Sequence, residues 1–164
     1  TVPDLSDEAL IATLEEWLPP LLVGKRRLGD VDPDALAASL EARLGWDGRK
    51  RLEALAPAAF ATPAGTTHPI DYEAEAGPTV TVRVQALFGL SKHPSVAGEP
   101  IVLSLTSPAG RPIQTTRDLP GFWRGSWKEV AREMRGRYPK HPWPDDPASA
   151  QPTLRTKKAD APGR

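Results

Sequence analysis

Four prolines within nine residues constrain the chain near its C-terminal end: Pro139, Pro142, Pro144 and Pro147. Because proline fixes φ and has no amide hydrogen, this stretch can neither continue a helix nor occupy the interior of a sheet. Immediately before it, Ser126-Trp127-Lys128-Glu129 has the spacing of a capping box, which predicts that a helix begins there. The sequence therefore predicts a helix that is followed by an extended strap, residues 139–147.

The predicted helix has an apolar face and a basic face. Its apolar side chains recur at helical spacing: Trp127, Val130 and Met134. Its basic side chains recur at the same spacing: Lys128, Arg132 and Arg135. Gly136 can adopt a left-handed backbone conformation and is expected to end the helix.

Basic and aromatic side chains continue from this helix into the strap, and together they form the candidate nucleic-acid-binding site. Its members are Lys128, Arg132, Arg135, Arg137, Tyr138, Lys140 and Trp143. Lys and Arg neutralise phosphates without reading sequence, and an aromatic ring that stacks on a base contributes about 1–3 kcal/mol. The alternative is an intramolecular clamp, in which Trp143 pins the strap onto the domain's own surface.

A formal net charge of zero conceals a strong asymmetry along the chain. Residues 1–60 carry seven Lys/Arg and eleven Asp/Glu, and residues 61–110 carry two Lys/Arg and four Asp/Glu. Residues 111–164 carry twelve Lys/Arg and six Asp/Glu. A basic C-terminal third on an acidic chain suits a polyanionic partner. It is equally compatible with a helix that is solvated by long basic side chains.

Helical patterns dominate the first third of the chain. Ser6, followed by two acidic residues, suits the start of a helix. The apolar stripe of this helix comprises Leu10, Leu14, Trp17, Leu18 and Leu21. We expect it to end or kink at Pro19-Pro20. Asp32-Pro33 predicts the start of a second helix that ends at Gly45, and a third is expected over residues 47–56.

The pattern changes to strands after Pro57. Strands are predicted over residues 66–72, 79–84, 101–106 and 111–116. The turn sequence from Ser107 to Gly110 joins the last two strands into a hairpin, and Leu87–Leu90 is expected to form a short helical turn.

These elements predict an α+β fold. N-terminal helices are followed by a small antiparallel sheet, a C-terminal amphipathic basic helix and an extended Pro/Trp strap. The predicted divisions are a helical lead-in at 1–56, an α+β domain at 57–147 and a flexible tail at 148–164.

The residues show no constellation for catalysis or for binding a metal or a nucleotide. Asp7-Glu8-Ala9-Leu10 resembles the start of an acidic helicase box, but it lacks the histidine and suits a helix N-terminus. Gly24-Lys25 lacks the upstream glycine of a phosphate-binding loop. The three histidines share no metal-ligand spacing, and Asp145-Asp146 is expected to be structural. We therefore predict that this chain is not an enzyme and holds no cofactor.

Several features bear on the setting of the chain. The only methionine is Met134 and the chain begins Thr1-Val2-Pro3, so we expect a fragment of a longer protein. There is no cysteine, and no run of about 18 apolar residues that could span a membrane. A cytoplasmic location away from membranes is expected.

Several motifs carry a resemblance to a known family. They comprise Asp71-Tyr72-Glu73, Leu87–Leu90, Ser107–Leu119 and Arg135–Pro147. On these motifs the chain resembles, from about Leu52 to Lys158, the C-terminal domain of the bacterial HrpB-type ATP-dependent RNA helicases. It departs from the family pattern at Ser91-Lys92-His93, where an acidic residue usually stands before the next proline.

The resemblance implies a parent protein that hydrolyses ATP, with Mg²⁺, on two RecA-like domains and translocates on RNA. Residues 57–147 would be its C-terminal domain, and the rest of the helicase chain would be its partner. We expect an accessory module that supports the helicase core and contacts single-stranded RNA. The alternative is a protein-interaction module that docks the helicase to a partner through the acidic helical lead-in or the strap.

Overall fold

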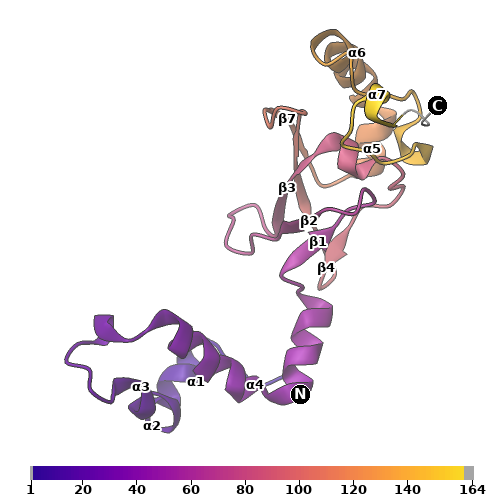
Figure 1. Cartoon of the computed structure of the whole chain (residues 1–164). Helices are drawn as coiled ribbons and strands as arrows, with labels where there is room; N and C mark the ends of the chain where they lie inside the picture. Colours follow the sequence, from indigo (N-terminus) through magenta and orange to yellow (C-terminus); the bar gives the residue numbers. More distant parts are fainter. Residues whose placement is uncertain (1, 161–164) are drawn as a thin grey trace. The chain divides into compact units, whose positions relative to one another are not determined.

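The computed structural model describes residues 2–160. The chain divides into two compact units, Thr1–Ala56 and Pro57–Arg164. The first unit is helical and the second combines helices with small sheets (Figure 1), which confirms the α+β class. No helix within residues 2–160 is long and apolar enough to cross a membrane.

Short helices build most of the first unit. They are α1 (Asp7–Ala12), α2 (Leu14–Trp17), α3 (Pro19–Leu22), the 3₁₀ turn η1 (Leu28–Asp30) and the long α4 (Pro33–Leu55). Ser6 begins α1 as predicted, since its Oγ accepts a hydrogen bond from the Ala9 amide at 3.4 Å. The helix breaks at Thr13, earlier than the expected break at the two prolines. Thr13 Oγ1 donates to the Ala9 carbonyl at 2.9 Å, a bond of the type that bends helices.

Helix α4 follows its sequence signals closely. Asp32 Oδ1 accepts a hydrogen bond from the Asp34 amide at 3.0 Å and caps the helix. Gly45 interrupts α4 with φ 66° and ψ 179°, a backbone conformation that favours glycine, and a second helical stretch follows it to Leu55. The predicted break and the helix after it are both confirmed.

A three-stranded sheet lies at the centre of the second unit. Its strands are β3 (Thr79–Arg83), β6 (Val102–Thr106) and β7 (Pro112–Thr116), in the order β3-β6-β7. Strands β6 and β7 form the predicted antiparallel hairpin, whose turn is closed by a hydrogen bond from the Gly110 amide to the Ser107 carbonyl at 2.9 Å.

The expectation of a wholly antiparallel sheet was wrong, because β3 pairs with β6 in parallel, with Val80 opposite Leu103 and Val82 opposite Leu105. Alternation of apolar residues assigns side chains to a face of the sheet but carries no information on strand direction. The connection between β3 and β6, residues 84–101, is long enough for the crossover that parallel strands need.

Two small hairpins and a helical turn surround this sheet. The hairpins are β1 (Ala59–Ala61) with β2 (Thr67–Pro69), and β4 (Ser95–Val96) with β5 (Glu99–Pro100). The helical turn expected at Leu87–Leu90 lies slightly earlier, as η2 (Val84–Leu87). Gly89 follows it with φ 87°, and a Cβ at this position would lie 3.0 Å from the Ala150 carbonyl oxygen. Only glycine allows this close approach without strain.

Two consecutive helices, α5 (Leu119–Arg124) and α6 (Trp127–Arg137), complete the second unit, and α5 was not predicted. The predicted capping box is absent: Ser126 has helical angles, φ −63° and ψ −21°, and its side chain caps nothing. The reason is that the chain reaches Ser126 from another helix, whereas a capping residue needs an extended backbone. Gly136 lies inside α6 and does not end it; the helix ends before Tyr138, because Pro139 disfavours a helical conformation there.

The core of the second unit combines the sheet with a cluster of aromatic rings from Phe88, which follows η2, and from α5, α6 and the strap. Figure 1 shows α5, α6 and α7 (Lys157–Asp160) gathered at one end of this unit. Trp127 is 2% exposed and lies at the centre of the cluster. Its ring meets those of Phe88 at 5.5 Å and Trp123 at 5.3 Å in edge-to-face geometry, an arrangement that aromatic pairs favour.

The segment 148–164 was expected to form a flexible tail, but three residues in its first part, Ala148, Ala150 and Leu154, pack on this core. Residues 161–164 of the predicted tail lie outside the described residues. Pro147 begins a 3₁₀ turn, η3 (Pro147–Ser149), and its carbonyl accepts a hydrogen bond from the Gly89 amide at 2.8 Å. Ala150 and Leu154 contact the core cluster. Apolar residues of this segment therefore contribute to the core of the second unit.

Candidate nucleic-acid interface

Two tryptophans fasten the strap to α6 by reciprocal hydrogen bonds. Trp143 Nε1 donates to the Tyr138 carbonyl and Trp127 Nε1 donates to the Pro144 carbonyl, each at 2.9 Å. The two rings lie 6.2 Å apart, and Trp143 is 5% exposed. A ring so deeply buried offers no face to a nucleic-acid base. This geometry corresponds to the intramolecular clamp.

Arg135 belongs to the same clamp. Its Nη2 donates to the Trp143 carbonyl at 2.7 Å and to Asp145 Oδ1 at 2.9 Å, so one guanidinium bridges two residues of the strap. A planar guanidinium with several donors suits such bridging better than an ammonium group would. Asp145 lies at the surface, so the ion pair itself contributes little and the backbone contact fixes the geometry.

The next two candidates also have partners within the second unit. The Tyr138 hydroxyl lies 3.2 Å from Ser107 Oγ, which connects the end of α6 to the β6–β7 turn, and its half-buried ring packs on the core. Arg137 pairs with Glu133 at 3.3 Å, one helical turn away. Tyr138 therefore presents little ring surface for stacking.

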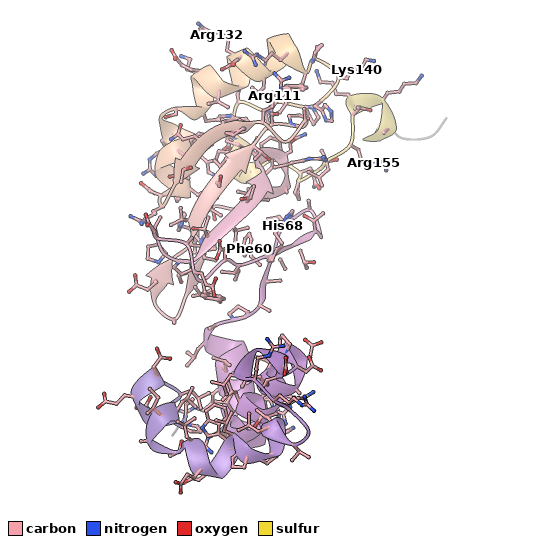
Figure 2. The ribbon with its side chains drawn as sticks, turned by 90° about the vertical axis from the view of Figure 1, so that its left-hand side faces the viewer. Phe60, His68, Arg111, Arg132, Lys140 and Arg155 are labelled. Atoms are coloured by element: carbon pink, nitrogen blue, oxygen red, sulfur yellow. The ribbon has the colours of Figure 1, made fainter. Side chains whose placement is uncertain are left out.

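All five basic candidates are exposed to solvent, but Arg135 and Arg137 are ion-paired. The remaining three are Lys128, Arg132 and Lys140. Within residues 2–160, their side chains make no hydrogen bond or ion pair. Figure 2 shows Arg132 projecting outward from α6 and Lys140 lying beyond the C-terminal end of that helix. These cations are available to an external anion.

Lys128 lines a basic recess between α5 and α6, of about 310 Å³. The apolar side chains of the recess are Trp123, Trp127 and Ala131, and its charged side chains are Arg124, Lys128, Arg135 and Asp145. Three cations and one carboxylate give the recess a positive balance. Arg124 was not among the predicted site residues, because α5 was not predicted. No helical spacing would have signalled it, because the break at Gly125 separates Arg124 from the helix that carries Lys128.

The opposite flank of α6 has a mixed charge. Arg132 lines a shallow depression there together with Glu129 and Glu133. A phosphate that approached Arg132 from this flank would meet two carboxylates, which oppose it. The predicted continuous basic stripe is therefore divided into a recess at Lys128, a mixed flank at Arg132 and a separate cation at Lys140.

The histidines have structural contacts. His93 Nε2 lies 2.6 Å from the Ile101 carbonyl, and its Nδ1 accepts from the Leu119 amide at 3.0 Å. His68 contacts the Thr66 hydroxyl at 2.9 Å, and His141 lies 3.3 Å from the Gln85 amide nitrogen. In residues 2–160, no three His, Cys, Asp or Glu side chains form a group that could hold a metal ion.

The second unit is a small α+β unit in which the basic helix α6 packs on an aromatic core. The family model described as "ATP-dependent helicase C-terminal" (HrpB_C) matches residues 17–147. The chain therefore belongs to the HrpB-type family of helicase C-terminal domains.

Similar proteins agree with this assignment. The chain is 44% identical over 158 residues to the ATP-dependent RNA helicase HrpB of Escherichia coli (strain K12), an alignment that covers 95% of this chain and 20% of that protein. A crystal structure of the E. coli DExH-box NTPase HrpB superposes with a TM-score of 0.83 at 44% identity, over 94% of this chain and 19% of the other. A second crystal structure, described as the E. coli DEAH/RHA helicase HrpB, superposes with a TM-score of 0.66 at 40% identity. This match covers 86% of this chain and 18% of the other. The chain thus spans about a fifth of the length of these relatives.

Proposed function

We propose that this chain is the accessory C-terminal module of a cytoplasmic ATP-dependent RNA helicase, that it supports the helicase core, and that it contacts single-stranded RNA through the basic side of α5 and α6. The observation that carries the RNA contact is the recess that Arg124 and Lys128 line beside the ion pair of Arg135 with Asp145. Cations gathered on one side of the domain attract phosphates by electrostatic attraction.

The clamp divides the predicted site into two roles. Lys128 and Lys140, joined by Arg124, are the main phosphate-contacting residues of the proposal, and Arg132, beside Glu129 and Glu133, is a weaker one. Arg135, Arg137, Tyr138 and Trp143 hold the end of α6 and the strap in place. Binding would then be electrostatic and tolerant of sequence, since no aromatic ring in this set is free to stack on bases.

ATP chemistry is assigned to the remainder of the parent helicase. Neither of the two candidate motifs within residues 2–160 fits an ATP site. Asp7 and Glu8 form the first turn of α1 beneath the Ser6 cap, and Gly24-Lys25 lies in a loop between α3 and η1 that has no glycine-rich cradle. No catalytic step is therefore assigned to residues of this chain.

Salt-dependent RNA binding tests the proposal. We expect the chain to bind a single-stranded RNA of mixed sequence weakly at about 50 mM salt, with log affinity falling as log salt rises. The variant Arg124→Ala/Lys128→Ala/Arg132→Ala should bind less tightly, and its slope should flatten by about 0.7 for each phosphate that the variant no longer neutralises.

A matched variant that removes three exposed cations elsewhere, Arg26→Ala/Arg83→Ala/Lys92→Ala, should retain the wild-type slope. Equal slopes for all three proteins would contradict the RNA contact. That result would favour the alternative function, docking of the helicase to a protein partner.

A further inference from the structure

The first unit has almost no core of its own. Among its described residues, Leu44 is the only buried hydrophobic side chain, and it is 8% exposed. The second unit, by contrast, buries the whole aromatic and aliphatic cluster. A segment of this size needs to remove most of its apolar surface from water to be stable.

Large apolar side chains of this unit are instead exposed to solvent. They include Ile11, Val23, Leu28, Trp46, Leu52 and Leu55, with Val23 at 78% and Leu28 at 72%. Scattered exposed apolar residues are ordinary in proteins, but a contiguous apolar surface marks a site of interaction. The unit has two contiguous surfaces of this kind.

The first surface is a groove along α2 and α3, of about 400 Å³. It is lined by Leu14, Glu15, Leu18, Pro19, Leu22 and Val23. The three leucines recur every four residues, so they form one stripe along the continuous helical path of α2 and α3. The lining is apolar apart from Glu15, which suits an apolar occupant.

The second surface is the end of α4. Gly48, Leu52 and Leu55 lie on one face of the helix at helical spacing. Gly48 is buried against Leu44 and Pro3, whereas Leu52 and Leu55 are 45% and 55% exposed. The stripe is therefore covered in its first turn and open in the next two.

We infer that these two surfaces are covered, in the parent protein, by the part of the helicase polypeptide that precedes this module. The chain accounts for only 20% of the length of its helicase relative and matches a C-terminal family model, so the larger part of the polypeptide precedes it. A covalently linked partner is present at high effective concentration, which favours it over a protein that must diffuse to the site.

The acidic character of the unit defines the expected chemistry of the covering surface. Residues 1–56 carry eleven Asp/Glu against seven Lys/Arg. The covering surface should thus present apolar side chains to the groove and to Leu52 and Leu55, with basic residues at its rim. The inference rests on the module's place in a helicase and not on its RNA contact.

Amide hydrogen exchange on the full-length parent helicase tests the inference. In the wild-type protein, the amides of α2, α3 and residues 49–55 should exchange slowly. The variant Val23→Glu/Leu55→Glu places charges on both surfaces at positions that solvent already reaches in this structure, so it should make exchange in these segments at least about tenfold faster.

Two controls make the outcome specific. Ala37→Glu/Ala38→Glu adds the same charge at exposed positions of α4 outside both surfaces and should leave exchange unchanged. Lys128→Ala/Arg132→Ala should also leave it unchanged, even where it abolishes RNA binding. Rapid exchange of these segments in the wild-type parent would overturn the inference, as would protection that appears only at high protein concentration, because a second copy would then be the cover.

Discussion

At the scale of single residues, the only tryptophan of the strap, Trp143, faces the core. Trp143 is flanked by prolines and basic residues, a setting that suits a nucleic-acid contact, yet it donates to the Tyr138 carbonyl and lies against Trp127. Arg135, a basic candidate by charge, likewise serves the strap through the Trp143 carbonyl. Charge and aromaticity were visible in the sequence, but the partner of each side chain depends on the folded path of the chain.

Substitution of Trp143 distinguishes the clamp from base stacking. Trp143→Ala should lower the free energy of unfolding by about 3–5 kcal/mol, because it empties a well-packed site and leaves the Trp127 ring uncovered. Trp143→Phe should cost less, since it keeps much of the ring volume and removes only one hydrogen bond, worth about 1 kcal/mol. Chemical denaturation of both variants measures these differences. If Trp143→Ala weakened RNA binding while leaving stability unchanged, the ring would be a stacking residue and the clamp would be excluded.

At the scale of secondary-structure elements, α6 has one buried face and one exposed face. Trp127, Ala131 and Met134 are buried, while Lys128 and Arg132 are exposed. Trp127→Ala should therefore reduce the free energy of unfolding by about 3–5 kcal/mol, whereas Lys128→Ala should change it by less than about 0.5 kcal/mol. Similar denaturation midpoints for the two variants would show that the faces of α6 are assigned the wrong way round.

Features of the elements that depend on neighbouring residues could be predicted from the sequence. The caps at Ser6 and Asp32, the break at Gly45 and the β6–β7 hairpin could all be predicted, because each depends on a few neighbouring residues. Local patterns cannot specify the direction of β3 relative to β6. Strand direction is set by where residues 84–101 carry the chain, which is a matter of packing across the whole unit.

Local patterns also failed at the start of α6, where the cap at Ser126 was predicted wrongly and α5 was not predicted. Ser126 has the residue type of a helix cap, but a cap also needs an extended backbone, and the unpredicted α5 delivers the chain in a helical one. The missing α5 also concealed Arg124, and with it the recess. The nucleic-acid-binding role of this region stays a prediction, whereas the contacts that hold Arg135, Tyr138 and Trp143 within the fold could not be predicted from the sequence.

At the scale of the whole molecule, the two units differ in how much apolar surface they bury. The second unit has a packed core, and the first leaves apolar surface open that the remainder of a helicase is suited to cover. Under the proposed function, such a module would contribute position and contact surface to its parent, and the ATP chemistry would be carried out elsewhere in the polypeptide.

One prediction at this scale concerns nucleotide. The chain on its own should show the same thermal unfolding midpoint with and without ATP and Mg²⁺, because a ligand stabilises a protein only when it binds the folded state. Differential scanning fluorimetry measures this directly. A reproducible increase of several degrees with ATP would reveal a nucleotide site in these residues.

The most direct test of the RNA contact is chemical labelling of lysines in the full-length parent helicase, with and without single-stranded RNA. An acylating reagent modifies exposed amines, and mass spectrometry reports the extent at each position. We predict that RNA protects Lys128 and, to a lesser extent, Lys140, while Lys25 and Lys92, exposed elsewhere on the chain, are labelled equally in both conditions. Equal labelling of Lys128 with and without saturating RNA would contradict the proposed interface.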